Sequence, residues 1–139
     1  PGGKLIFTVN SEKIDKMLYW PKRLKSWGFP KLAKKYIRKY HQVFKHKTLW
    51  SDKKWREVLQ KAGFKVQAMR EIISPEATRT FDFYIVTSWP SQLIKVIFGR
   101  RWAWRPRWFR EWLVRKYSWL VEQNEREGSN LFIVAIKPR

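Results

Sequence analysis

Two apolar segments at opposite ends of the sequence constrain the fold more than any other feature. Residues 4–9 and 130–137 are rich in β-branched and aromatic side chains, a composition that favours strands. Residues 5–9 show no alternation of apolar and polar side chains, and this pattern predicts a strand covered on both faces. Each segment is the most apolar partner available to the other. We therefore expect the two to pair as central strands, with the rest of the chain inserted between them.

A helix, a turn and a strand are predicted over residues 50–73. Ser51 is a good N-cap, and Trp50 and Trp55 have the spacing of a hydrophobic staple at the start of the helix. Gly63 supplies the C-terminal stop. The alternation of apolar and polar residues that follows indicates a strand with one covered face, nearer a sheet edge.

The segments between these elements carry mainly helical patterns. An apolar stripe at residues 14–18 predicts a short helix that Pro21 ends, and residues 30–44 have the pattern of a basic amphipathic helix with a proline in its first turn. Pro75 opens a further helix. Residues 80–88 fit either a strand or a helix by propensity alone.

Composition limits the classes of partner. The chain has 139 residues, a length typical of one domain, and 31 basic against 11 acidic residues give a net charge of +20. This charge indicates an anionic partner, which is nucleic acid, a phospholipid surface or an anionic substrate. Ten tryptophans favour a membrane interface or a deep binding cleft, because an indole has an apolar body and one N–H group. No segment approaches the roughly 20 apolar residues of a membrane-spanning helix, and the absence of cysteine excludes thiolate metal sites.

Three segments occur in the same order as landmarks of one enzyme family. They are residues 1–9 (PGGKLIFTV), residues 55–66 (WREVLQKAGFKV) and residues 130–138 (NLFIVAIKP). They resemble segments of class I S-adenosylmethionine-dependent methyltransferases. The first is similar to the family's loop and fifth strand, and the second to its helix, alanine-glycine-phenylalanine turn and sixth strand. The third is similar to its seventh, antiparallel strand. The resemblance covers roughly a third of the chain and implies a Rossmann-like arrangement of these strands.

The resemblance implies an α/β fold in a single domain, residues 1–139. We expect a small three-stranded mixed sheet from residues 4–9, 65–72 and 130–137, with the last strand antiparallel in the middle. Two long insertions, residues 10–49 and 74–130, should supply helices that cover the sheet.

The family's glycine-rich cofactor loop has no counterpart, since the six glycines of the chain form no cluster after a strand. The resemblance therefore implies the substrate-side half of a methyltransferase, and an N-terminal half that is not in this sequence would hold S-adenosylmethionine. The intact enzyme would act on a hydrophobic or membrane-proximal small molecule, and this chain alone is expected to be inactive and to bind no cofactor. The alternative is a non-catalytic basic module that binds anionic lipid surfaces or nucleic acid.

Four polar residues are candidates for the chemistry of such an enzyme. His41 is the candidate catalytic proton acceptor, and His46, Glu76 and Arg79 are candidate substrate-binding residues. Each has a simpler interpretation: the histidines as polar residues at the end of a basic helix, and Glu76 with Arg79 as an ordinary surface pair one turn apart. The spacing of the two histidines does not favour a metal site.

Arginines alternate with tryptophans near a predicted helix over residues 107–125. The pattern predicts a membrane-binding or anion-binding surface, because guanidinium groups pair with phosphate and indoles lie at headgroup depth. Single-stranded nucleic acid, or packing within the protein, would also account for the aromatic residues. We expect a cytoplasmic protein, with peripheral contact to the inner membrane surface as the further expectation. The residues of this candidate surface are Arg100, Arg101, Trp102, Trp104, Arg105, Arg107, Trp108 and Trp112.

Overall fold

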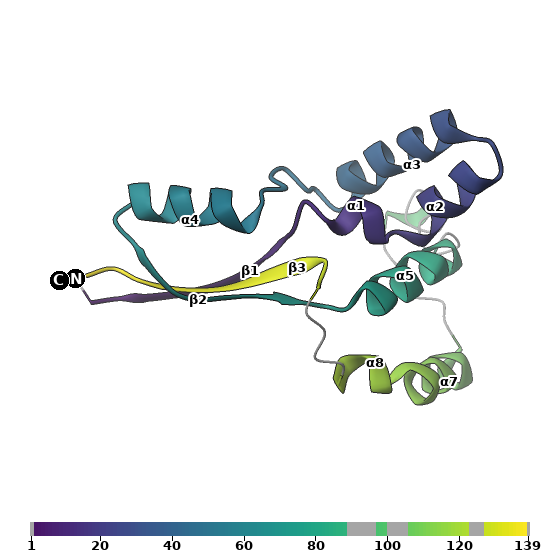
Figure 1. Cartoon of the computed structure of the whole chain (residues 1–139). Coiled ribbons are helices and arrows are strands. Elements are labelled where there is room, and N and C mark those ends of the chain that lie inside the picture. The colour runs from purple at the N-terminus through teal and green to yellow at the C-terminus, as the bar shows by residue number, and fades with distance from the viewer. Residues whose placement is uncertain (1, 89–96, 100–105, 123–126, 139) are drawn as a thin grey trace.

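The computed structural model describes residues 2–88, 97–99, 106–122 and 127–138. A three-stranded sheet lies at one end of the molecule, and a lobe of helices lies at the other (Figure 1). The elements in chain order are β1 (Lys4–Asn10), α1 (Ile14–Met17), α2 (Tyr19–Ser26), α3 (Pro30–Val43), α4 (Asp52–Lys61), β2 (Lys65–Ile72), α5 (Pro75–Tyr84), the 3-10 turn η1 (Ile85–Ser88), α7 (Arg107–Tyr117), α8 (Trp119–Glu122) and β3 (Asn130–Ile136).

The sheet has the strand order β1-β3-β2, which confirms the prediction that the last strand lies between the other two. Lys4 is opposite Ile136 in one ladder, and Lys65 is opposite Ile136 in the other. Both ladders are antiparallel, so the described sheet is antiparallel rather than mixed. A register shift between Val66 and Ala68 places a bulge in β2.

One face of the sheet forms a core with α4, which lies along it in Figure 1. The covering helix therefore lies between the two predicted insertions, whereas the described helices of residues 10–49 and 74–130 form the lobe at the other end. Leu131, Ile133 and Ala135 of β3 point to this face and are buried against Leu59 of α4. This alternation along β3 is the period of two expected for a strand with one covered face.

The prediction that residues 5–9 are covered on both faces is wrong. Leu5 is 37% exposed and Ile6 is 56% exposed. The physical reason is that β1 is an edge strand of the described sheet, and no helix of the described residues lies along the sheet face opposite α4 in Figure 1. An unalternating apolar run therefore does not distinguish a central strand from an edge strand with one bare face.

The predicted helix-turn-strand unit is confirmed. Ser51 accepts a hydrogen bond from the backbone N–H of Lys54 at the start of α4, and the rings of Trp50 and Trp55 lie 4.8 Å apart. Gly63 has a φ of 79° after the helix, a conformation that favours glycine. The alternating segment that follows forms β2, an edge strand.

The expected end of a helix at Pro21 is wrong in position. The chain breaks at Leu18, whose ψ of 139° is extended, and Pro21 lies inside the first turn of α2. Proline is tolerated there because the first backbone N–H groups of a helix have no intrahelical acceptor.

The helix predicted over residues 107–125 is divided at Ser118 into α7 and α8. Residues 123–126 lie outside the described part of the chain. Residues 80–88 are helical.

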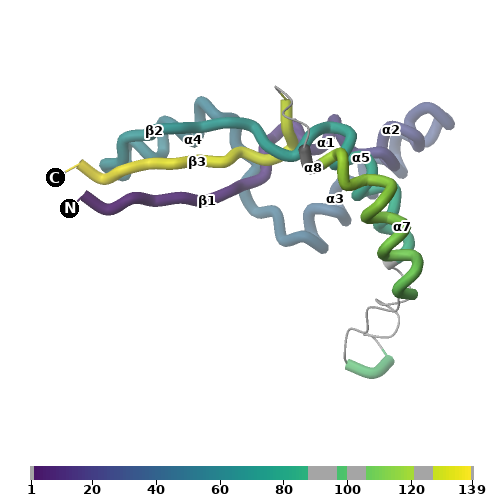
Figure 2. The backbone as a smooth tube through the Cα atoms, turned by 90° about the horizontal axis from the view of Figure 1, so that it is seen from below, coloured from purple at the N-terminus to yellow at the C-terminus, as the bar shows by residue number. Residues whose placement is uncertain are grey.

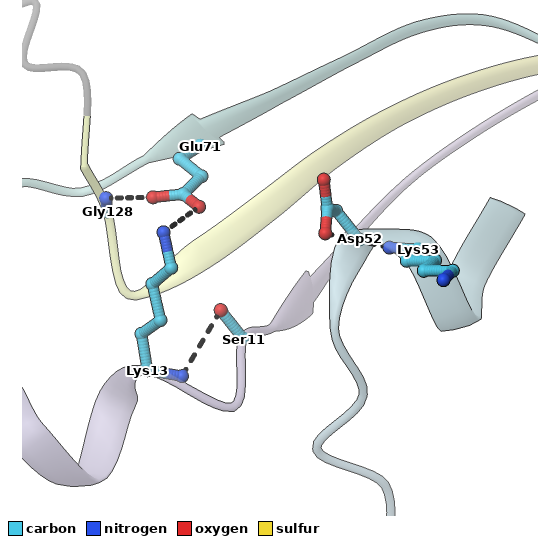
Figure 3. A network of polar contacts seen from close by, with 6 residues as sticks. All are labelled: Ser11, Lys13, Asp52, Lys53, Glu71 and Gly128. Atoms are coloured by element: carbon cyan, nitrogen blue, oxygen red, sulfur yellow. Dashed lines mark hydrogen bonds and ion pairs between the residues drawn. The ribbon is translucent and has the colours of Figure 1, made fainter.

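The sheet and the helical lobe meet at a polar junction, drawn in Figure 3. The carboxylate of Glu71, near the end of β2, accepts hydrogen bonds of 2.7 Å from the Lys13 ammonium and from the backbone N–H of Gly128. Ile73 follows at a φ of 64°, which is unfavourable for a β-branched residue, and its carbonyl accepts from the N–H of Ser129 at 3.0 Å. These contacts fix the entry to α5 against the start of β3.

Gly128 allows this junction to close. A Cβ atom at this position would lie 2.3 Å from the carbonyl oxygen of Ile72, a separation that backbone atoms cannot accommodate without shifting. We predict that Gly128→Ala lowers the free energy of unfolding by roughly 2–4 kcal/mol, measured by urea denaturation. Gly3→Ala is the matched control, because nothing lies within 4 Å of the added atom, and it should be nearly neutral. Equal effects of the two substitutions would contradict the description of this junction.

Candidate functional site

A buried carboxylate organises the helical lobe. Asp82 on α5 has no exposed surface, and its Oδ2 accepts a 2.9 Å hydrogen bond from the backbone N–H of Trp20 in the first turn of α2. Its Oδ1 accepts a 2.5 Å hydrogen bond from the hydroxyl of Tyr36 on α3. Asp82 therefore caps α2 from another helix, because no side chain at the start of α2 does so.

Burial governs the titration of this cluster. Desolvation raises the pKa of Asp82 above its ordinary value, although the hydrogen bonds from Tyr36 and from the backbone of Trp20 and Tyr19 oppose the change. Desolvation and the hydrogen bond to Asp82 raise the pKa of Tyr36, and desolvation raises the pKa of Tyr40 to about 12. Both tyrosines are therefore neutral at physiological pH, and Tyr36 is the one that donates to Asp82.

The end of α3 brings the two histidines of the chain together. The N–H of His46 donates to the carbonyl of His41 at 2.9 Å, and the N–H of Lys45 donates to Gln42 at 3.3 Å. This is a Schellman turn, in which Lys45 occupies the left-handed position at a φ of 54°. Sequence spacing alone did not favour a common face for the histidines, because His46 lies beyond the helix and the turn folds it back.

His41 connects a carboxylate to His46. Its Nε2 lies 2.8 Å from Oδ1 of Asp15, and its Nδ1 lies 3.1 Å from Nδ1 of His46. A carboxylate only accepts, so Nε2 of His41 carries the proton, and a neutral His41 accepts at Nδ1 from the Nδ1–H of His46. With both imidazoles neutral and Nδ1 of His46 protonated, Nε2 of His46 is the ring nitrogen that is free to accept a proton.

Aromatic rings surround the histidine pair. The ring of Tyr40 lies 5.7 Å from that of His46, and the ring of Phe44 stacks on His46 at 5.8 Å and also contacts Phe81 of α5. Burial lowers the pKa of His46, and the neighbouring His41 lowers it further. The pair can accept and relay a proton. No group of three or more potential ligands among the described histidine and carboxylate side chains is arranged to hold a metal ion.

Glu76 and Arg79 are both exposed on α5. In the described part of the chain, the structure gives no ion pair between them and no contact of either with the histidines. The predicted grouping of Glu76 and Arg79 with His46 therefore has no geometric support here.

A groove between α5 and the helices α7 and α8 has a volume of about 580 Å³. This volume lies within the range of about 300–1,000 Å³ typical of small-molecule sites. The hydroxyls of Tyr84 and Tyr117 lie 3.1 Å apart, and this hydrogen bond, together with burial, raises the pKa of Tyr84 to about 12. The lining is mainly apolar and consists of Ala77, Thr80, Phe81, Tyr84, Leu113, Val114, Tyr117, Ser118 and Leu120.

The tryptophans of α7 and α8 face solvent. Trp108 is 68% exposed, Trp112 is 41% exposed and Trp119 is 48% exposed. Arg107 makes an exposed 2.8 Å ion pair with Glu111 on the same helix. Packing within the described protein therefore does not account for these indoles. The other predicted residues of this surface, namely Arg100, Arg101, Trp102, Trp104 and Arg105, lie outside the described residues.

Sequence reasoning missed Asp15 and Asp82. Asp15 is 26 residues from His41 and Asp82 is 46 residues from Tyr36, so no local spacing predicts either contact. For Asp82 the available signal was an acidic residue inside the aromatic stretch FDFY, where a carboxylate requires a buried partner. The groove had no sequence signal, because it depends on how α7 packs against α5.

The lowered pKa of His46 predicts a pH dependence of stability. The folded state favours neutral His46, so this contribution is complete above the unfolded pKa near 6.5 and is lost as the pH falls through the folded value. Between about pH 7.5 and pH 5, the wild type should therefore lose more stability than His46→Gln. The substitution removes the imidazole of His46 together with its hydrogen bond to His41, so the difference between the two profiles reports on the histidine pair. Urea unfolding at each pH measures the difference, and parallel profiles would contradict this environment for His46.

Described side chains thus form a histidine pair with an orienting carboxylate, an apolar groove and an exposed tryptophan surface. Helices among the described residues are too short or too polar to cross a membrane. No family model matches the chain, and no curated protein and no solved structure matches it.

Proposed function

We propose that this chain is the substrate-side part of an S-adenosylmethionine-dependent methyltransferase that acts on a hydrophobic or membrane-proximal small molecule. The observation that carries the proposal is the strand order, with the last strand antiparallel between the other two. This order is the one that the resemblance of residues 1–9, 55–66 and 130–138 implies. The cofactor-binding half is the proposed partner.

The open edge of β1 supports a partner at this position. The described sheet leaves one side of β1 without a neighbouring strand. An edge with free backbone groups can accept a further strand. No glycine cluster follows a described strand, so no cofactor contact is assigned to this chain.

The helical lobe supports a substrate-side role. Its apolar groove has the volume of a small-molecule site, and the Tyr84–Tyr117 hydroxyls are polar groups that can orient a ligand. The histidine pair is the proposed proton acceptor, with a change from the sequence-based assignment. His46 accepts the proton at Nε2, and His41, held by Asp15, positions it.

Cofactor binding tests this proposal. We predict that S-adenosylmethionine binds the 139-residue chain weakly or not at all in calorimetry, because the glycine-rich loop is absent. The native protein that contains this chain should bind the cofactor at micromolar concentration, and its β1 amides should be protected from hydrogen exchange. Micromolar binding by the 139 residues alone would overturn the assignment of the cofactor to another half. Failure of the native protein to bind would overturn the methyltransferase proposal.

A second candidate function is peripheral binding to an anionic lipid surface, on the cytoplasmic side of the inner membrane. The specific observation that favours it is the exposure of Trp108, Trp112 and Trp119 beside the basic residues of α7. Lysine or arginine near an anionic leaflet contributes on the order of 1 kcal/mol each, and indole insertion adds apolar burial. Nucleic acid is the alternative anion for this surface.

Vesicle sedimentation tests the second candidate. We predict binding to phosphatidylserine vesicles that is much stronger than to neutral vesicles and partly resistant to 1 M salt, where the Debye length falls to about 3 Å. The double substitution Trp108→Ala and Trp112→Ala should remove the salt-resistant fraction. Ile6→Ala is the control, because it removes an exposed apolar side chain from the sheet and leaves α7 unchanged. Oligonucleotide binding without vesicle binding would favour nucleic acid instead.

A further inference from the structure

A second exposed aromatic site lies at the turn between α2 and α3. Trp27 is 52% exposed, Phe29 is 56% exposed and Leu32 is 49% exposed. We call these three residues the hairpin tip. They form a group in which each side chain leaves about half of its surface in water, although the buried residues Ala33 and Tyr40 lie on the same hairpin.

The backbone of this turn is fixed. The N–H of Phe29 donates to the carbonyl of Leu24 at 2.9 Å, and the N–H of Gly28 donates to Lys25 at 3.1 Å. This is a second Schellman turn, with Gly28 at a φ of 82°, and Pro30 begins α3 immediately after it. A fixed turn that holds Trp27 and Phe29 outward reduces the entropy lost when they bind.

The sequence around the hairpin tip carries only basic charges. No acidic residue occurs between Asp15 and Asp52, whereas residues 21–50 contain ten lysines and arginines. The guanidinium of Arg23 lies 5.2 Å from the centre of the Trp27 ring. The exposed cations nearest in sequence are Lys22, Arg23 and Lys25 on α2 and Lys31, Lys34 and Lys35 on α3.

We propose that the hairpin tip inserts into the surface of an anionic bilayer. Trp27 and Phe29 would enter the headgroup and acyl boundary, while the surrounding lysines pair with lipid phosphates. The tip is the outer end of a helical hairpin, on the side of the molecule away from the termini (Figures 1 and 2). The end of a helical hairpin suits a planar surface better than single-stranded nucleic acid, which is bound in a basic groove that follows its backbone. This proposal rests on the second candidate function, binding to an anionic lipid surface, and adds a second site of contact to it. The site does not depend on α7.

Site-specific labels test the proposal while Trp27, Phe29 and Leu32 are kept. The chain has no cysteine, so Ser26→Cys, Arg115→Cys and Gln60→Cys each accept one environment-sensitive fluorophore. These positions report on the hairpin tip, on the α7 surface and on the remote helix α4. With phosphatidylserine–phosphatidylcholine vesicles, the label at position 26 should shift to the blue and be quenched by brominated lipid. The label at position 60 should not change.

A matching substitution tests the energy of insertion. Trp27→Ser with Phe29→Ser should weaken binding to the same vesicles by at least about tenfold, since the two half-exposed aromatic side chains together contribute that factor or more when they are buried. Circular dichroism on each variant verifies that the hairpin is folded.

Each outcome decides between the two membrane sites. An unchanged label at position 26 on vesicle-bound protein overturns insertion of the tip, and a simultaneous response at position 115 leaves the α7 proposal standing. A response at position 26 alone supports the tip and contradicts α7. Absence of vesicle binding overturns both sites. A response at position 26 to an oligonucleotide but not to vesicles overturns the bilayer as the partner.

Discussion

The hydrogen bonds of Asp82 determine the arrangement of the helical lobe. This carboxylate has no exposed surface, yet it joins α5 to the first turn of α2 and, through Tyr36, to α3. A buried charge without such partners would be strongly unfavourable, so α2, α3 and α5 must stay together for the carboxylate to remain satisfied. The histidine pair at the end of α3 and the turn at the end of α2 both depend on this assembly. One acidic residue thus positions features that are distant from it in sequence.

The boundaries of α4 and the alternation along β2 were predictable because they depend on residues that are close in sequence. Ser51, Gly63 and the alternation along β2 each act within a few residues, and the resemblance supplied the strand order. The exposure of β1 was not predictable from its apolar run, because coverage depends on which other elements reach that face. The roles of Asp15 and Asp82 likewise follow from contacts across 26 and 46 residues. Pro21 was misleading since proline ends a helix only beyond its first turn, and the pattern did not show where that turn began.

The two helices of the hairpin end in the same backbone turn with different residues at the left-handed position. Gly28 adopts a φ of 82° at the end of α2 without a steric cost, whereas Lys45 adopts 54° at the end of α3. The first turn presents Trp27 and Phe29 to solvent, and the second folds His46 back onto His41. The same type of turn therefore exposes an apolar surface at one end of the hairpin and brings two titratable histidines together at the other.

The polar junction around Glu71 has a mechanical consequence, because it helps to fix the orientation of the α2–α3 hairpin relative to the sheet. The helix α3 has 14 residues and is therefore about 21 Å long, and the hairpin extends this length away from the sheet. By simple geometry, a rotation of about 10° at the base would displace the far end by about 4 Å over that length. The two 2.7 Å hydrogen bonds of Glu71 and the close approach of Gly128 to Ile72 resist such a rotation. The contacts of Glu71 and Gly128 at the sheet thus help to set the position of the distant turn.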